Sequence, residues 1–574
     1  MLRTTNDTRR PSGAAKGWAS FVDSVRVSHV RVVALLIGFC VLAFLPGFFR
    51  IPPIDRDEAR FAQATKQMVE TGDYVDIRFQ DEVRYKKPVG IYWLQAGAVK
   101  LGEALGVSRA HTQIWLYRIP SLIGAIGAVL LTYWTALAFV SRRAALLAAL
   151  MLASSILLGV EARLAKTDAM LLLTVVAAMG AMARVYLSDR RALPDKTSSW
   201  ALPAIFWTAT AAGVLLKGPL ILMFIALTAG TLIVVDRSAR WLLLLRPVAG
   251  IAWLAVLVLP WFIAILTKSG DAFLTESLGN DLFAKVVSSQ ETHGAPPGYY
   301  LLLFWATFWP AAPLAALAAP AVWAARREPG TRFLLAWTVP SWIVFEIVMT
   351  KLPHYVLPLY PAIAILTAGA MDNGVLARTR WLVRGAAWWF ILPIVICLTG
   401  IIGAIVIGQQ LSLTAWPFAA AAIILGLLAW RLYESDGAEV SLLRAAGASI
   451  LVAIALYGII VPSLGPLFPS IALAGIQRDA SCSQPIAASA GYEEPSLVFL
   501  AGTSTLLVDA ANAAEFLRQG GCRFAFIDAR LERSFAQRAE AIGLRYAPGP
   551  RIDAYNISGA RAVTIAVYRS EEQP

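Results

Sequence analysis

The chain alternates between long apolar stretches and short polar connections, a pattern typical of a protein that crosses a membrane many times. Apolar runs of about 17–25 residues, each long enough to span a bilayer as a helix, recur about thirteen times. They lie near residues 31–49, 118–140, 144–160, 168–187, 200–216, 219–235, 248–266, 300–323, 333–350, 355–371, 384–408, 414–430 and 445–466. We therefore predict an α-helical integral membrane region over residues 31–466, after a tail at residues 1–30.

One polar interruption, residues 51–117, is much longer than most of the others. Asp55, with Glu58 three residues later, is a helix start signal, and the apolar residues that follow share one helical face. This predicts an amphipathic helix that lies on the membrane and ends near Gly72. Residues 75–79 alternate as an extended segment would. We interpret the apolar segment 88–105 as a second interfacial helix, since counting it as a span would reverse every later orientation.

Charge fixes the orientation of the predicted spans. The chain has 574 residues, 58% hydrophobic and 15% charged, with a net charge of +13. The surplus is concentrated in short connections on one side, which the positive-inside rule assigns to the cytoplasm; these hold Arg142, Arg143, Arg237, Arg240, Arg246, Arg326, Arg327, Arg332, Arg378, Arg380 and Arg384. This distribution argues against a nucleic-acid partner. Residues 51–117, 161–167, 267–299, 351–354 and the segment after 467 then face the periplasm.

The C-terminal segment, residues 467–574, differs in composition from the rest of the chain. Strand character is found at residues 496–501, 504–510, 523–529 and 560–569, and helical character at 511–520 and 529–544. This alternation predicts a small periplasmic α/β domain. Cys482 and Cys522 both lie in it. In an oxidising compartment they would form a disulfide, and two free thiols are the alternative.

Acidic, basic and aromatic residues gather on the predicted outer face. Carboxylates can orient or deprotonate an attacking hydroxyl, and fixed cations can hold a phosphate and stabilise its charge as it leaves. The acids are Asp57, Glu58 and Asp168, and the cations are Arg60, Lys86, Lys87, Lys217 and Lys351. Neither a Walker loop nor a GxGxxG turn precedes a helix, which argues against a nucleotide. Ordinary readings remain open: a solvated cap around Asp168, snorkelling of Lys217 and an incidental loop histidine at His293.

In combination, these residues resemble the GT-C class of polyprenyl-phosphate-sugar glycosyltransferases, in particular the bacterial aminoarabinose transferases that modify lipid A and, more distantly, the protein O-mannosyltransferases. The resemblance covers nearly the whole chain and rests on several motifs. These are D-E-x-R at Asp57, Glu58 and Arg60, the turn with Tyr85, Lys87, Pro88, Tyr92 and Trp93, the segment Arg163 to Asp168, Lys217-Gly218, K-L-P-x-Y at Lys351 to Tyr355, and the closing residues 555–569.

The resemblance implies roles for these residues. Asp57 would be the main catalytic or orienting carboxylate, Asp168 the second essential acid, and Glu58 a further catalytic candidate. The residues implied to bind the lipid phosphate or sugar are Arg60, Tyr85, Lys86, Lys87, Arg163, Lys217, Lys351 and Tyr355. In the aminoarabinose transferases, a glutamate before the turn lysine is paired with a loop histidine as a metal site. Here Lys86 replaces that glutamate while His293 matches the histidine, so a divalent metal stays an open question, and an acidic or neutral sugar fits at least as well as an amino sugar.

We therefore expect an inverting glycosyltransferase of the bacterial inner membrane, whose active face is periplasmic. Its expected partners are a polyprenyl-phosphate-linked sugar donor of the undecaprenyl type, a lipid or glycolipid acceptor such as lipid A, and the bilayer itself. A protein hydroxyl is the alternative acceptor. A flippase for a lipid-linked sugar is the alternative of another class, but the ionisable residues gather at span ends rather than at mid-membrane, and no internal repeat is evident.

Overall fold

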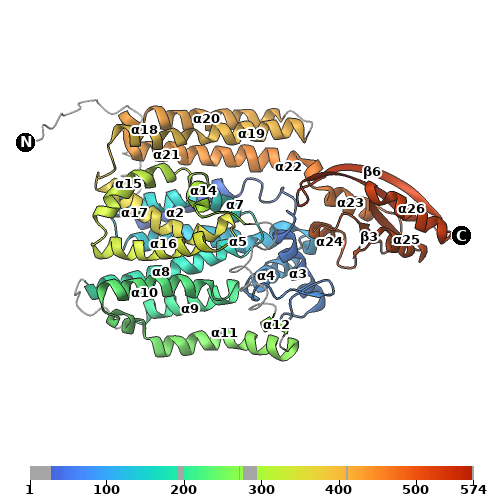
Figure 1. Ribbon diagram of the computed structural model, residues 1–574, viewed down its shortest axis with the longest axis horizontal. Coiled ribbons are helices and arrows are strands. Elements are labelled where there is room, and N and C mark those ends of the chain that lie inside the picture. The colour runs from blue at the N-terminus through green and yellow to red at the C-terminus, as the bar shows by residue number, and fades with distance from the viewer. Residues whose placement is uncertain (1–27, 191–198, 271, 276–293, 409–411, 572–574) are drawn as a thin grey trace, which may run out of the picture.

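The computed structural model describes residues 28–190, 199–270, 272–275, 294–408 and 412–571. The chain is mostly helical: its helices lie side by side in a bundle, and a sheet lies beyond one end (Figure 1). The bundle helices are α2 (His29–Phe44), α5 (Ile114–Ala136), α6 (Arg142–Ala153), α7 (Ile156–Glu161), α8 (Asp168–Arg190), α9 (Ala201–Lys217), α10 (Leu220–Asp236), α11 (Pro247–Ser269), α14 (Tyr299–Thr307), α15 (Ala312–Ala324), α16 (Pro329–Ile347), α17 (Tyr360–Asp372), α18 (Arg380–Ala387), α19 (Leu392–Val406), α20 (Trp416–Arg431) and α21 (Tyr433–Ala453).

The apolar pattern placed the helices of the bundle well. Within the described ranges, seven helices are long and apolar enough to cross a membrane, and four shorter apolar helices accompany them. The chain is thus a multi-pass membrane protein, whereas the span number of about thirteen stays a prediction. Some predicted stretches are interrupted: residues 300–323 form α14 and α15 on either side of Pro310, and 355–371 begins as the 3-10 helix η4 (Pro353–Leu359). Proline accounts for such breaks because it lacks a backbone donor.

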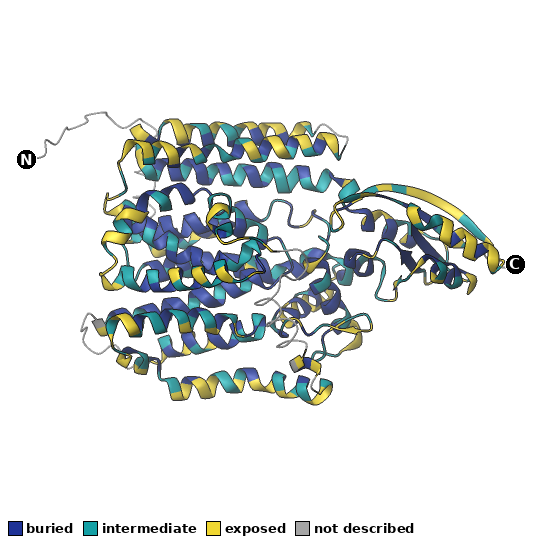
Figure 2. Cartoon of the chain, viewed as in Figure 1, coloured by how far each residue is buried: buried dark blue, intermediate teal, exposed yellow. Residues whose placement is uncertain are grey.

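Helices α5 and α8 pack against each other closely enough to require small residues. A Cβ atom on Gly124 would lie 2.8 Å from the backbone carbonyl carbon of Ala169, so only glycine fits there. Close backbone approach through small residues is the usual way for helices to associate in a membrane. Figure 2 shows that buried residues concentrate in the central helices, whereas exposed residues are frequent along the outer ones. The beginning of α8, which carries Asp168, is therefore fixed against a rigid neighbour.

The polar stretch after α2 forms two short helices and a small hairpin. Helix α3 (Asp57–Thr71) ends where Gly72 adopts a φ of 72°, as predicted, and α4 (Gly90–Ala104) matches the second interfacial helix in extent. Strands β1 (Arg78–Phe79) and β2 (Glu82–Val83) pair between them. The predicted start signal was wrong: Asp55 does not cap α3, because its carboxylate accepts a hydrogen bond from the Ser496 backbone N–H instead, at 2.9 Å.

The C-terminal segment contains a five-stranded sheet flanked by helices. The strands are β3 (Ile486–Ala490), β4 (Leu506–Leu507), β5 (Arg523–Asp528), β6 (Tyr546–Asn556) and β7 (Arg561–Ser570), in the order β4-β3-β5-β7-β6. The helices are α23 (Pro469–Arg478), α24 (Pro495–Ala501), α25 (Ala510–Arg518) and α26 (Glu532–Ala541). Strand β3 runs parallel to β4 and β5, whereas β7 is antiparallel to β5 and β6. A disulfide joins Cys482 to Cys522.

One strand prediction in this segment was wrong. Residues 496–501 form most of helix α24, because Pro495 suits the first turn of a helix and Gly502, with a φ of 133°, ends it. A short apolar run cannot distinguish a buried strand from a buried helix by periodicity alone. The correction matters for the site, because α24 packs on α3. The Lys66 ammonium donates to the Phe499 carbonyl at 2.9 Å, and the Gln63 amide donates to the Thr503 hydroxyl at 2.9 Å.

Candidate functional site

A buried group of acids and bases lies where several helix ends meet. We call it the acid–lysine cluster: Glu161, Lys166, Asp168, Lys217 and His354, all buried or nearly so. Asp168 opens α8, where the positive end of the helix dipole favours a carboxylate. Lys217 closes α9 just before Gly218, whose positive φ of 65° ends the helix, so an ammonium lies at a negative helix end.

The members of the acid–lysine cluster contact one another directly. The Lys217 ammonium donates to Asp168 Oδ1, and the Lys166 ammonium lies 3.1 Å from Glu161 Oε1 and 3.8 Å from Asp168 Oδ2. The His354 ring sits between the two acids, 3.7 Å from an oxygen of each. Lys217 also lies 5.4 Å from the ring centre of Tyr355. The structure thus brings three predicted site residues together: Asp168, Lys217 and Tyr355.

Two residues of the long polar loop act electrostatically on this cluster. Burial lowers the pKa of Lys166, but its ion pairs with Glu161 and Asp168 more than reverse this, and the charge of Asp57 adds to the increase. The Lys87 ammonium likewise acts on His354. Asp57 and Lys87 therefore lie within electrostatic range of Lys166 and His354, respectively, although they come from a different part of the chain.

Asp57 is the exposed acid of this site. Its carboxylate makes no hydrogen bond or ion pair with the part of the chain that the structure describes. The neighbours of Asp57, in contrast, are all anchored: Asp55 to Ser496, Arg56 to the Ser558 carbonyl at 2.7 Å, and Glu58 to the bundle. The chain therefore holds Asp57 in place through its neighbours while leaving its carboxylate available.

Glu58 was predicted as a catalytic acid, and in the structure protein groups donate to both of its carboxylate oxygens. Its side chain is 2% exposed. The carboxylate accepts hydrogen bonds from Arg118 through both oxygens, at 2.8 and 2.9 Å, and from the backbone N–H groups of Ile54 and Ala165. A buried carboxylate with this many donors is committed to holding its partners together. Glu58 ties the loop before α3 to the segment that contains Lys166.

Arg118, the main partner of Glu58, was not predicted as a site residue. Besides Glu58, its guanidinium donates to the carbonyls of Phe48, Ile51 and Pro52 at 2.7–3.1 Å, and its side chain is fully buried. Arginine suits such a site because its rigid fork can bind several acceptors at once. A signal was present, since Arg118 is an arginine at the start of a long apolar run and an ionisable residue in such a position needs a partner.

Two predicted phosphate-binding residues are engaged elsewhere. The Arg163 guanidinium donates to the carbonyls of Ala43, Pro46 and Gly159. It also lies over an aromatic ring. Arg163 therefore does not join the acid–lysine cluster. The Lys351 ammonium donates to three carbonyls at the end of α16, at 2.8–3.1 Å. Both residues satisfy helix ends that would otherwise leave acceptors without donors.

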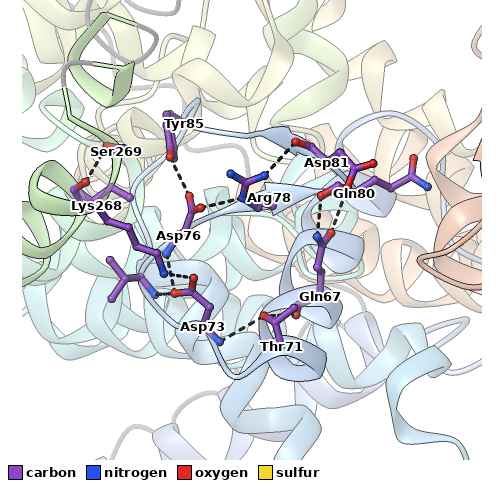
Figure 3. Close-up of polar contacts among 12 residues, drawn as sticks. Gln67, Thr71, Asp73, Asp76, Arg78, Gln80, Asp81, Tyr85, Lys268 and Ser269 are labelled. Carbon is purple, nitrogen blue, oxygen red and sulfur yellow. Dashed lines mark hydrogen bonds and ion pairs between the residues drawn. The ribbon is translucent and has the colours of Figure 1, made fainter.

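The remaining candidates of the loop are spread around α3. Figure 3 shows Tyr85 pointing to Asp76, to which its hydroxyl donates at 2.8 Å, so Tyr85 belongs to the hairpin network rather than to the cluster. Lys86 is exposed, and its carbonyl accepts from the Lys87 ammonium at 2.8 Å. Arg60 is half-buried and acts on Asp55. His293 lies outside the described residues.

The cluster also has the composition of a metal site, because Glu161, Asp168 and His354 each offer one ligand atom within 4.8 Å of the others. However, Lys166 already contacts Glu161 Oε1, and Lys217 contacts Asp168 Oδ1. A divalent cation that used these two oxygens would have to displace two ammonium groups from a buried position. One buried atom, Glu161 Oε2, has no protein partner within the described ranges.

Glu161, Lys166 and His354 were not predicted as site residues. Their signal was nonetheless visible, because each lies within a few residues of a predicted one: Glu161 and Lys166 precede Asp168, and His354 precedes Tyr355. Polar residues at the junction between two spans carry function more often than polar residues on the surface of a soluble protein, because the membrane makes them costly.

Comparison with known proteins finds a likeness to glycosyltransferases. The family model of dolichyl-phosphate-mannose-protein mannosyltransferases matches residues 60–272. The undecaprenyl phosphate-alpha-4-amino-4-deoxy-L-arabinose arabinosyl transferase of Erwinia tasmaniensis is 30% identical over 314 residues, which is 54% of each chain. The protein of the same name from Pectobacterium carotovorum is 27% identical over 363 residues, 62% of each chain. The alignments thus span less than two thirds of these relatives.

The fold extends the likeness over nearly the whole chain. The crystal structure of ArnT from Cupriavidus metallidurans bound to undecaprenyl phosphate superimposes with a TM-score of 0.71 at 18% identity, covering 94% of this chain and 98% of that one. Its apo structure gives a TM-score of 0.70. The predicted resemblance is therefore confirmed: in sequence and in fold, the chain resembles the GT-C polyprenyl-phosphate-sugar glycosyltransferases that include the aminoarabinose transferases.

Proposed function

We propose that this protein is an inverting glycosyltransferase that moves a sugar from an undecaprenyl-type polyprenyl phosphate to a lipid acceptor, with lipid A or another lipopolysaccharide component as the leading candidate. The observation that carries the proposal is the buried contact of Lys217 with Asp168 beside Lys166 and His354, a cluster on which the charges of Asp57 and Lys87 act. The names of the relatives support the donor class, since they are transferases of an undecaprenyl-phosphate sugar.

In the proposed reaction, an acceptor hydroxyl attacks the anomeric carbon of the donor sugar. A new carbon–oxygen bond forms as the bond between that carbon and the phosphate oxygen breaks, and the polyprenyl phosphate leaves with the bonding electrons. Asp57 is suited to take the hydroxyl proton, because its carboxylate is free of protein partners within the described ranges. Lys217 and Lys87 are suited to stabilise the charge that grows on the phosphate.

Asp168 has a different part in this proposal. It pairs with Lys217 and lies near Lys166, so it fixes the direction in which two cations point. Preorganised charges need no reorganisation at the moment of reaction, which is why they stabilise a developing charge effectively. His354 lies 3.7 Å from an oxygen of each acid, and Lys166, which contacts both Glu161 and Asp168, limits their repulsion. The ammonium groups of the acid–lysine cluster would then be oriented to bind the phosphate.

We further propose about thirteen spans in the bacterial inner membrane, with the site and residues 467–574 on the periplasmic side, the latter as an α/β domain. The basic connections favour this orientation. The disulfide between Cys482 and Cys522 also supports it, since such bonds persist in oxidising compartments. At this surface the enzyme would meet both a lipid-linked donor and a lipid acceptor without using nucleotides.

The decisive experiment measures transfer by the purified protein in proteoliposomes. Undecaprenyl phosphate carrying a radiolabelled sugar would be supplied with lipid A as acceptor, and the panel of sugars would include 4-amino-4-deoxy-L-arabinose, a neutral sugar and an acidic one. Formation of a labelled glycolipid supports the proposal. Movement of label across the bilayer without a new glycoside would replace the enzyme with a flippase, and labelling of protein alone would replace the lipid acceptor.

A further inference from the structure

The short segment before α3 has a backbone conformation that it does not adopt by preference. Arg56 has a φ of 69° and a ψ of −112°, a combination that suits glycine and is strained for any residue with a Cβ atom. Such strain persists only where surrounding contacts impose it. Arg56 is the residue immediately before Asp57, so the contacts that impose this conformation also set the direction of the Asp57 carboxylate.

The contacts that hold Arg56 come from the C-terminal segment, more than 400 positions along the chain. The Arg56 guanidinium donates to the Ser558 carbonyl at 2.7 Å, and the Ser496 N–H donates to the Asp55 carboxylate at 2.9 Å. Ser558 lies in the turn that joins β6 to β7, and Ser496 lies in α24. Both residues belong to elements that are built around the C-terminal sheet.

The turn at Ser558 is itself held by two side-chain hydrogen bonds. The Asn556 side chain accepts a hydrogen bond from the Gly559 N–H at 2.8 Å, and the Ser558 hydroxyl donates to Glu494 at 3.0 Å. This turn is part of the closing motif, residues 555–569, which the catalytic proposal leaves without a role. The opposite side of the loop is held by the bundle, through Glu58 and Arg118.

We propose that Arg56 is a positioning residue through which the C-terminal β6–β7 turn holds Asp57 in its reactive orientation. The bundle fixes the loop from one side through Glu58, and the C-terminal segment fixes it from the other side through Arg56 and Asp55. Asp57 lies between these anchors with its carboxylate free of the described residues. The C-terminal segment is then a working part of the enzyme, although it contributes no group to the reaction.

The test compares two substitutions that remove the same hydrogen bond. Arg56→Ala loses the contact with Ser558 and keeps a Cβ atom in a strained conformation, so the loop relaxes. Arg56→Gly loses the contact but adopts the native φ without strain. We expect Arg56→Ala to lower kcat at least about tenfold with the donor KM within about twofold of the wild type, whereas Arg56→Gly recovers at least half of that loss on a logarithmic scale.

Matched controls separate this role from a general effect of removing charge. Arg50→Ala removes a nearby exposed arginine whose weak contact with the Gly458 carbonyl lies outside the site, and it should leave kcat unchanged. Ser558→Ala keeps the carbonyl that accepts from Arg56 but loses the hydroxyl contact with Glu494, so it should lower kcat by less than Arg56→Ala does. Wild-type kcat in Arg56→Ala, or equal impairment of the alanine and glycine variants, would overturn the proposal.

A second readout does not depend on catalysis, which matters because the inference rests on the proposed function. Hydrogen exchange of the peptide covering residues 52–60 in the full-length protein should be faster in Arg56→Ala than in the wild type and Arg50→Ala. If the wild type transfers no sugar but this difference appears, the proposed function fails while the holding contact stands. Unchanged exchange in Arg56→Ala would remove the holding contact, whatever the activity.

Discussion

The two aspartates that the motifs identified, Asp57 and Asp168, are held in opposite ways. Asp168 is buried and neutralised by Lys217, with Lys166 and His354 close by. Asp57 is exposed and without a hydrogen-bond partner in the described ranges, while the residues on both sides of it are anchored. A carboxylate that already has its cations is suited to organising charge, and one without partners is suited to accepting a proton. Their motifs alone did not separate these roles.

The largest effect that follows from this comparison concerns Asp57. Asp57→Asn removes the proposed base without removing any contact of the described structure, so we expect transfer to fall by about 10²–10⁴-fold. The free energy of unfolding should change by no more than about 0.5 kcal/mol, because the side chain is exposed. Initial rates in proteoliposomes and thermal unfolding in detergent measure the two quantities on the same preparation.

Asp81→Asn provides the matched control for that experiment. Asp81 is an exposed aspartate of the same polar loop, and it belongs to the β1–β2 hairpin rather than to the site (Figure 3). This variant should retain wild-type rates. A well-folded Asp57→Asn protein with wild-type activity would assign the base to another group and would end the distinction between the two aspartates.

The next effect concerns stability at Asp168. Lys217→Ala leaves the buried Asp168 carboxylate without its direct partner, and breaking a buried pair in this way typically costs about 3–5 kcal/mol. Transfer should also be lost. The double variant Asp168→Asn/Lys217→Met removes both charges and should be more stable than Lys217→Ala while remaining inactive. If Lys217→Ala were as stable as Asp57→Asn, the two acids would not differ as the structure indicates.

Sequence reasoning located the site better than it assigned roles within it. Polar residues at span ends are costly in a membrane, so Asp168, Lys217 and Tyr355 could be grouped before any coordinates, and the structure does bring them together. The roles of Glu58, Arg163 and Lys351 depended on which backbone groups needed a partner. These acceptors and donors belong to helix ends from distant parts of the chain, and no local pattern records them.

Prediction of the fold from the sequence was limited in a similar way. Apolar length identified the bundle helices, because a membrane span needs a long run that few other structures require. Residues 496–501 could be assigned to a strand or a helix on pattern alone, and only the neighbouring Pro495 and Gly502 favoured the helix. Asp55 looked like a cap because its spacing was right, yet its partner Ser496 lies on another element. A long-range partner decided the case of Asp55, whereas adjacent residues decided that of residues 496–501.

A smaller effect should appear with pH, and it should be confined to the segment before α3 and to α24, which Asp55 joins. Burial raises the pKa of the neighbouring Asp55 from its ordinary value of 3.8 to about 7. A carboxyl group with a raised pKa gives stability that is present below its unfolded value and is lost as pH rises through its folded value. The hydrogen exchange of the backbone amides of α24, after correction for intrinsic rates, should therefore be about tenfold faster at pH 8 than at pH 6.

Asp55→Asn distinguishes this titration from other sources of pH dependence. The amide keeps an oxygen that can accept from the Ser496 N–H but carries no titratable proton, so the difference in exchange between pH 6 and pH 8 should largely disappear. Exchange in the amides of α8 serves as the internal reference, since no contact of Asp55 reaches that helix among the described residues. An unchanged pH response in Asp55→Asn would assign the effect to another group.

The smallest expected effect follows from how the cluster is neutralised. Two lysines already contact one oxygen of Glu161 and both oxygens of Asp168, so prolonged treatment with a chelator should change the transfer rate by no more than about twofold. Lys166→Gln and Lys217→Gln should not make activity dependent on added Zn²⁺ or Mn²⁺. A strong loss on chelation, restored by one metal, would mean that an ion displaces a lysine during the reaction. Asp168 would then be a metal ligand rather than the partner of an ammonium group. It would differ from Asp57 by binding an ion and not by its pairing with lysine.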